Sequence, residues 1–117
     1  MRVGEGLFWS AISLWGIFFE HPAPEGCGTE GWRRLEAAAF RLYSSLGDLR
    51  RAGDVASTVD LLERMRRVAD ECDERLGELA GTELLCERAR LHLGTLRREL
   101  DHHRRDALLP GRAPGLR

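Results

Sequence analysis

Lysine is absent from this chain of 117 residues, and arginine supplies all 18 of its lysine-or-arginine positions. Nineteen acidic residues leave a formal net charge of −1 at pH 7. A chain so close to neutrality has no overall attraction to nucleic acid or to acidic lipid. Exclusive use of arginine suits bidentate contacts with anions. A GC-rich coding sequence gives the same composition, and we favour that simpler interpretation.

Cysteine is scarce, with three residues at Cys27, Cys72 and Cys86. An odd number cannot pair completely in disulfides within one chain, and no CxxC or paired Cys/His spacing predicts a zinc site. Cys72 and Cys86 fall on apolar positions of expected helices, where cysteine behaves as a small buried hydrophobe. We therefore expect a reducing, cytoplasmic compartment and no cofactor.

A hydrophobic run long enough to cross a membrane is also missing. The most apolar stretch, residues 7–19, would form a helix roughly 20 Å long, against a hydrocarbon core of about 30 Å. Its length suits a secretory signal, but residues 20–27 offer no small-x-small cleavage site, so secretion is not expected. Without a basic residue between Leu7 and His21, it also lacks the cationic face of an interfacial membrane helix.

The pattern that is present predicts a long antiparallel helical hairpin over residues 54–80 and 82–106. Apolar or small residues recur at alternating spacings of three and four, as in a coiled coil. Asp54 is placed to cap the first helix, and Gly81 lies where a C-terminal cap is wanted. Because Ala80, Gly81 and Thr82 alone make the turn, antiparallel pairing follows. The expected inward positions are Val55, Thr58, Leu62, Met65, Ala69, Cys72, Leu76 and Leu79 on the first arm and Cys86, Ala89, Leu93, Leu96, Leu100, His103 and Ala107 on the second.

Two further helices are expected before the hairpin, at residues 6–20 and 32–46. The second is amphipathic, with Gly47 closing it and residues 48–53 making a short bridge, or with Asp48 capping a helix broken at Gly53. The sequence therefore predicts an all-α bundle over residues 1–107 and a flexible tail at 108–117, where two prolines and two glycines occur.

The helix at 6–20 is apolar around nearly its whole circumference, and all eight aromatic residues of the chain precede the hairpin. A helix of this kind must cover something. It either lies across the open side of the hairpin and completes the bundle, or pairs with another subunit. The predicted partner-binding residues are Leu7, Phe8, Trp9, Ile12, Trp15, Phe18 and Phe19.

Charge is divided along the hairpin. Acidic residues gather near the turn, and arginines gather near the open end, which favours head-to-tail contacts or a partner with a split charge pattern. The open end also supports an alternative function, in which an arginine-rich helical subunit binds nucleic acid. The arginines of that hypothesis are Arg66, Arg67, Arg97, Arg98, Arg104 and Arg105.

One further cluster deserves testing as a metal site. Glu99 and His102 are three residues apart on one helix, with Asp106 one turn further on, and paired copies of such a motif hold di-metal centres in bundles. Because the chain carries one copy, a homodimer would have to supply the second. Capping or solvent-exposed histidines are the simpler interpretation.

Motifs of enzymes are missing: no nucleophile elbow, phosphate-binding glycine loop or dinucleotide fingerprint occurs. The sequence thus favours a non-enzymatic structural or adaptor subunit that associates with another protein or with itself. Nucleic-acid binding and metal binding across a homodimer are the alternatives.

Overall fold

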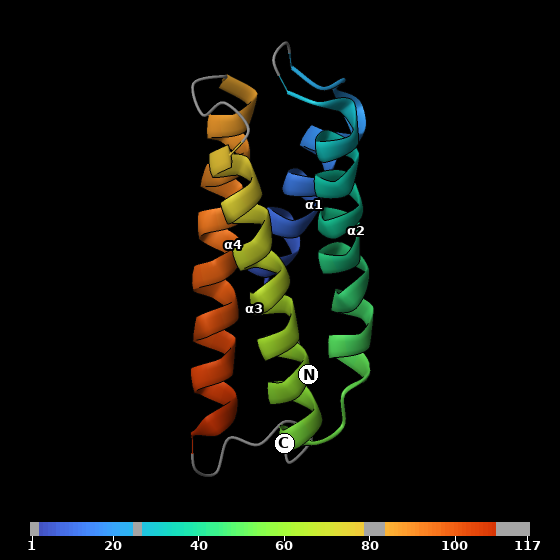
Figure 1. The fold of residues 1–117 in the computed structure, drawn as a ribbon. Coiled ribbons are helices and arrows are strands. Elements are labelled where there is room, and N and C mark those ends of the chain that lie inside the picture. Colours follow the sequence, from blue (N-terminus) through green and yellow to red (C-terminus); the bar gives the residue numbers. More distant parts are fainter. Residues whose placement is uncertain (1–2, 25–26, 79–83, 110–117) are drawn as a thin grey trace.

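The computed structural model describes residues 3–24, 27–78 and 84–109. Within these ranges it consists of four helices and no strand. They are α1 (Glu5–Glu20), α2 (Thr29–Arg51), α3 (Val55–Glu78) and α4 (Leu84–Leu108) (Figure 1). The predicted all-α bundle is confirmed. None of the helices in the described part of the chain has the length and hydropathy needed to cross a membrane.

The helices form a bundle in which each packs against two neighbours. The contacting pairs are α1 with α2, α2 with α3, α3 with α4 and α1 with α4, so the four helices stand at the corners of a square. Neighbouring helices run antiparallel, which gives an up-down-up-down bundle of 50 × 20 × 19 Å (Figure 1). The N-terminal half therefore does complete the bundle against the hairpin.

The hairpin has the predicted inward faces. The buried residues of α3 are Thr58, Leu62, Met65, Ala69, Cys72 and Leu76, and those of α4 are Cys86, Ala89, Leu93, Leu96, Leu100 and Ala107. Val55 and His103, which were also expected inside, are half-buried. Leu79 and the predicted turn at 80–82 lie outside the described residues.

Asp54 caps α3 as predicted. The main-chain N–H of Ser57 donates to Asp54 Oδ1 at 2.7 Å, which satisfies one of the amides that a helix leaves unpaired in its first turn. One residue further on, the Thr58 hydroxyl donates to the Asp54 carbonyl oxygen at 2.8 Å. A threonine can therefore be fully buried here without losing a hydrogen bond.

Helix α2 is longer than predicted. It spans Thr29–Arg51 rather than 32–46, and Gly47 does not end it. The buried residues Leu46 and Leu49 continue the apolar stripe past Gly47, and their burial outweighs the cost of a glycine in a helix, about 1 kcal/mol. At the other end, Gly28 is the N-cap, so the proline- and glycine-rich connection is shorter than its composition indicated.

Small residues let α1 approach α4 closely. A Cβ at Gly6 would stand 2.6 Å from Oε1 of Glu99 in α4, inside van der Waals contact. Ser10 is buried, and its hydroxyl donates to the Leu7 carbonyl oxygen at 3.1 Å. The two residues belong to the stripe of small side chains that includes Ser13 and Gly16 further along the helix.

Replacement of a core leucine tests this packing. Leu93→Ala removes a fully buried side chain from the centre of α4 and should lower the free energy of unfolding by about 2–5 kcal/mol. Leu91→Ala is the matched control, because Leu91 is 72% exposed, and should change stability by less than about 0.5 kcal/mol. Urea unfolding followed by circular dichroism measures both. Equal losses would contradict the assignment of the core face.

Candidate interaction surfaces

Helix α1 has two apolar faces, of which the bundle covers one. Leu7, Ala11, Leu14, Ile17 and Phe18 are buried against α2 and α4. Between them on the helix, Trp9 is exposed, and Phe8, Ile12 and Trp15 are apolar and half-buried. No acidic or basic side chain occurs between Glu5 and Glu20. Whichever side of this helix faces the core, its other side presents apolar groups.

The outward residues of α1 join two aromatic residues of α2 in one exposed surface, called here the aromatic face. It consists of Phe8, Trp9, Ile12, Trp15 and Phe19 of α1 with Phe40 and Tyr43 of α2. Trp15 lies at its centre, stacked on Tyr43 with ring centroids 5.5 Å apart and contacting Phe19 and Phe40 at 5.2 Å. Trp9, Phe19 and Phe40 are 60%, 64% and 46% exposed.

The structure divides the predicted partner-binding residues into two groups. Leu7 and Phe18 lie in the core of the chain itself, where Phe18 packs edge-on against Trp32 at 4.8 Å, so they are not accessible to a partner. The other five remain on the surface or at its edge. Phe40 and Tyr43 were not predicted as part of this surface. Their spacing of three on α2, displaced from its buried stripe, is the signal that could have identified them.

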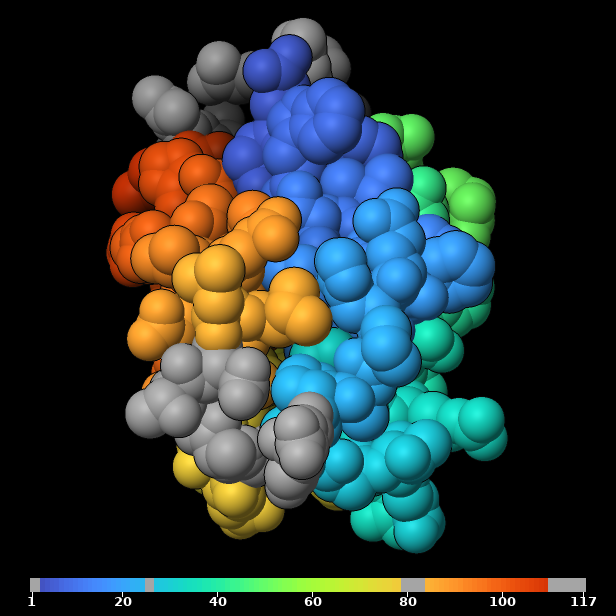
Figure 2. Space-filling view, turned by 90° about the horizontal axis from the view of Figure 1, so that it is seen from above, coloured from blue at the N-terminus to red at the C-terminus, as the bar shows by residue number. Residues whose placement is uncertain are grey.

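A hollow of about 450 Å³ adjoins the aromatic face, between α1 and α4. Gly16 lines the hollow, and an added Cβ there would meet no atom within 4 Å. Figure 2 shows the blue surface of α1 uncovered beside the orange and red surface of α4. The lining residues are Trp9, Ile12, Ser13, Gly16, Ile17, Glu20, His21, Arg88 and His92.

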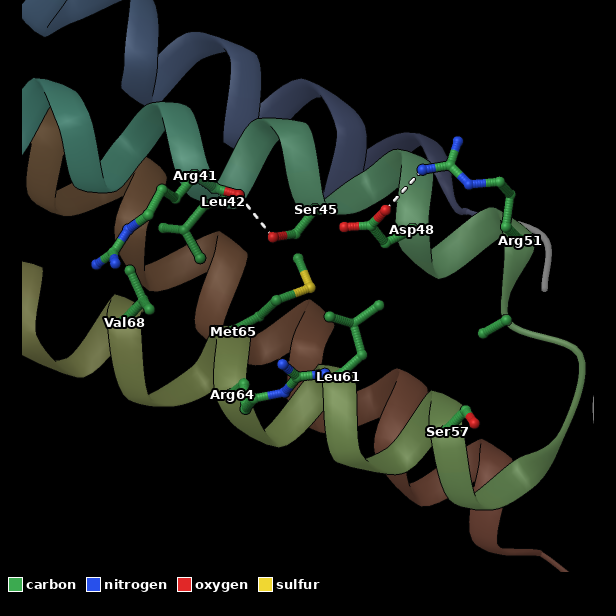
Figure 3. Close-up of a pocket in the computed structure, with 11 residues that line it drawn as sticks. Arg41, Leu42, Ser45, Asp48, Arg51, Ser57, Leu61, Arg64, Met65 and Val68 are labelled. Carbon is green, nitrogen blue, oxygen red and sulfur yellow. Dashed lines mark hydrogen bonds and ion pairs between the residues drawn. The ribbon is translucent and has the colours of Figure 1, made fainter.

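A second groove, of about 420 Å³, separates α2 from α3 and was not predicted (Figure 3). Leu42 of α2 and Leu61 and Met65 of α3 point toward one another across it. Its border carries Arg51, which pairs with Asp48 at 2.6 Å. Further border residues are Arg41 and Arg64, the latter paired with Asp60 at 3.1 Å. Two of the three bordering arginines are thus neutralised locally.

The arginine-rich end is largely engaged in ion pairs between α3 and α4. Arg66 contacts Asp70 and also Asp101, the latter at 3.0 Å. Arg97 Nε lies 3.0 Å from the same Asp70 carboxylate. The geometry is not that of a hydrogen bond, so the two side chains form an ion pair without one.

The remaining arginines of the nucleic-acid hypothesis divide in the same way. Arg104 pairs with Glu63 at 3.2 Å, whereas Arg67, Arg98 and Arg105 are exposed. Three of the six predicted arginines therefore join helices, which leaves less unpaired positive charge at this end than the sequence indicated.

Within one chain, Glu99, His102 and Asp106 do not form a metal-binding cluster, and the site across a homodimer stays a prediction. His102 is exposed, whereas the next residue, His103, faces α1. Its Nε2 lies 4.0 Å from Oε2 of Glu99, one turn earlier on the same helix α4. A Cβ at Gly4 would stand 3.3 Å from the same nitrogen, a tight contact that would require the His103 ring to shift slightly. Over the described ranges no three His, Cys, Asp or Glu side chains come together in a way that could hold a metal ion.

Comparison of the chain with protein-family models, curated proteins and solved structures finds no match. The function must therefore be inferred from the surfaces described above.

His103 makes the stability of the bundle depend on pH. Burial lowers the pKa of His103 below the ordinary value of 6.5, and this outweighs the opposite effect of Glu99. The folded state thus favours the neutral ring. The neutral ring of His103 contributes fully to the stability of the fold above pH 6.5. This contribution declines as the pH falls through the lower pKa that His103 has in the folded state. His92 acts in the same direction, because burial and Arg88 lower its pKa.

The variant His103→Gln should consequently lose less thermal stability between about pH 7.5 and about pH 5 than the unmodified chain does. His102→Gln, one position away on the exposed side of α4, is the comparison and should reduce the loss only slightly, because a protonated His102 also contributes to the lowered pKa of His103. Melting temperatures measured across this range test both. An identical pH dependence in His103→Gln would refute the role of the buried ring.

Proposed function

We propose that this chain is a non-enzymatic structural or adaptor subunit that binds another protein chain through the aromatic face. The observation that carries the proposal is the one-sided burial of α1, which leaves Trp9 and Phe19 each more than half exposed. A helix that is apolar all round is normally covered on every side. The uncovered side of α1 therefore calls for a partner.

The size of the exposed surface supports this role. Aromatic side chains have about 150–250 Å² of surface each, so the exposed fractions of Trp9, Phe19 and Phe40 leave roughly 250–430 Å² of aromatic area in water. Patches of a few hundred Å² on a monomer are often functional. Tryptophan and tyrosine are also the residues that most often dominate binding energy at interfaces.

The rest of the bundle serves as the scaffold in this proposal. The α3–α4 hairpin supplies the buried leucines against which α1 and α2 pack, and its ion pairs hold the two arms in register. Burial raises the pKa of the Cys72 thiol to about 11, so it stays protonated and poorly reactive. Such a buried thiol supports a cytoplasmic location for the chain, which is part of this proposal.

The test must keep α1, because a deletion of residues 1–20 would also remove Leu7, Leu14 and Phe18 from the core. We expect that a photoreactive residue in place of Phe19 will cross-link in the expressing cell to one discrete protein. The same residue in place of Leu91 is the matched control, since Leu91 is an exposed apolar side chain outside the aromatic face. Mass spectrometry identifies the product. Equal cross-linking at both positions, or none at either, contradicts the proposal.

A further inference from the structure

The exposed side chain of Trp9, called here the knob, and the hollow at Gly16 lie on the same side of α1. Trp9 is 60% exposed and lines one part of the hollow beside α4, and Gly16 lines the same hollow further along the helix. Seven residues separate them, which is nearly two full turns, so both point to the same side and lie about 10.5 Å apart along the axis. The midpoint between them falls between Ile12 and Ser13.

We infer that the aromatic face binds a second copy of this chain, with the two α1 helices antiparallel and each Trp9 seated over Gly16 of the other copy. The inference rests on the proposed function and names its partner. A two-fold axis between Ile12 and Ser13 exchanges positions 9 and 16, so one rotation fills both hollows at once. An interface of this kind is closed, because every contact occurs twice.

The shape of the hollow fits this occupant. It holds about 450 Å³, and the absence of a side chain at Gly16 leaves room for an indole ring to rest on the helix backbone. Ile12 and Ile17 give it apolar walls. Arg88 and His92 border it from α4, and a cation beside an indole face adds an attraction of its own.

Charge favours the antiparallel orientation. Helix α1 extends along α4 from the level of His103 to that of Arg88, so a two-fold axis through its middle sets the two bundles side by side over most of their length. The acidic end of one bundle then lies beside the basic end of the other. The acidic excess lies at the turn end, where Glu71, Asp73, Glu74 and Glu78 stand against Arg75. At the open end the exposed arginines are Arg50, Arg51, Arg64, Arg67 and Arg105, of which Arg51 and Arg64 are paired with Asp48 and Asp60.

One like-charge contact opposes this arrangement. The axis also exchanges positions 5 and 20, and both are glutamate. Arg88 borders the same end of the hollow as Glu20 and can neutralise the incoming Glu5.

The buried area predicts a weak dimer. Two copies together would cover roughly 500–860 Å² of exposed aromatic surface, to which the half-buried residues and polar rim add. Stable interfaces bury about 1,200–2,000 Å² in total, and the aromatic area alone is below this range. The dimer should therefore be weak and dissociate measurably on dilution.

Sedimentation of the purified full chain between about 1 and 100 μM should show a monomer–dimer equilibrium. Gly16→Leu fills the hollow and should weaken the dimer at least ~tenfold, although the same change raises the melting temperature by improving helix propensity. Gly94→Leu is the matched control, a helical glycine on α4 whose added Cβ meets only the tip of Arg98 at 3.5 Å. It should leave the dimer intact.

Exchanging the large and the small residue between positions 9 and 16 distinguishes a direct contact from an indirect effect of either substitution. Trp9→Ala should weaken the dimer, and combining it with Gly16→Trp should restore it, because the large and small residues again face each other across the axis. If the double variant is as weak as Trp9→Ala alone, the inference is wrong.

Cross-linking distinguishes the orientation. In a Cys27→Ser background, a mixture of Trp9→Cys and Gly16→Cys chains should form a disulfide between unlike chains under mild oxidation, whereas either variant alone should not. A parallel dimer would give the opposite result and would overturn the antiparallel geometry.

The outcomes separate this inference from the function on which it rests. A chain that remains monomeric at every concentration overturns the dimer, while cross-linking from position 19 to a different protein would still support the adaptor role. A monomer whose tryptophan emission shifts to the blue with phosphatidylcholine–phosphatidylserine vesicles would replace the second copy by a membrane surface. A dimer unaffected by Gly16→Leu but lost in Trp9→Ser with Phe19→Ser would keep the aromatic face as the interface and refute the seating of Trp9.

Discussion

The structure depends on the burial of one side of α1. This helix fills the space between α2 and α4 with Leu7, Leu14 and Phe18, and without them the hairpin would expose its own leucines to water. The same helix carries no charged residue from position 6 to position 19, so it has no polar side to turn outward. The core and the aromatic face are therefore consequences of one sequence segment. A polar substitution at an exposed residue of α1 leaves the core unaltered, whereas one at a buried residue disturbs it.

Much of this fold was predictable because its signals are local and repetitive. The spacing of Leu62, Met65 and Ala69 specifies a helix and its inward side, and Asp54 specifies where that helix begins. The extent of α2 was not predictable, since Gly47 is a weak helix former and only the burial of Leu49 against the bundle decides the matter. Tertiary packing overrode a local preference at that position.

The candidate surfaces were harder to predict than the fold. Sequence periodicity could not distinguish Phe18 from Phe19, because a helix that is apolar on every side gives no phase to the pattern, and only the positions of α2 and α4 decide which ring is buried. For the arginines the difficulty was different. Arg66 and Arg104 are close to acidic residues in space rather than in sequence, with partners Asp101 and Glu63 on the opposite arm. Their ion pairs could therefore not be assigned before the register of the hairpin was known.

The contact between α1 and α4 joins the first helix of the chain to the last. Local pairs such as α1 with α2 can form early, but Leu7 and Leu14 acquire their complete environment only after α4 has been synthesised. During translation α1 therefore leaves the ribosome before α4 does and stays incompletely covered until α4 docks. Until then its apolar side chains are exposed to aggregation, and the rate at which α4 docks sets how long that exposure lasts.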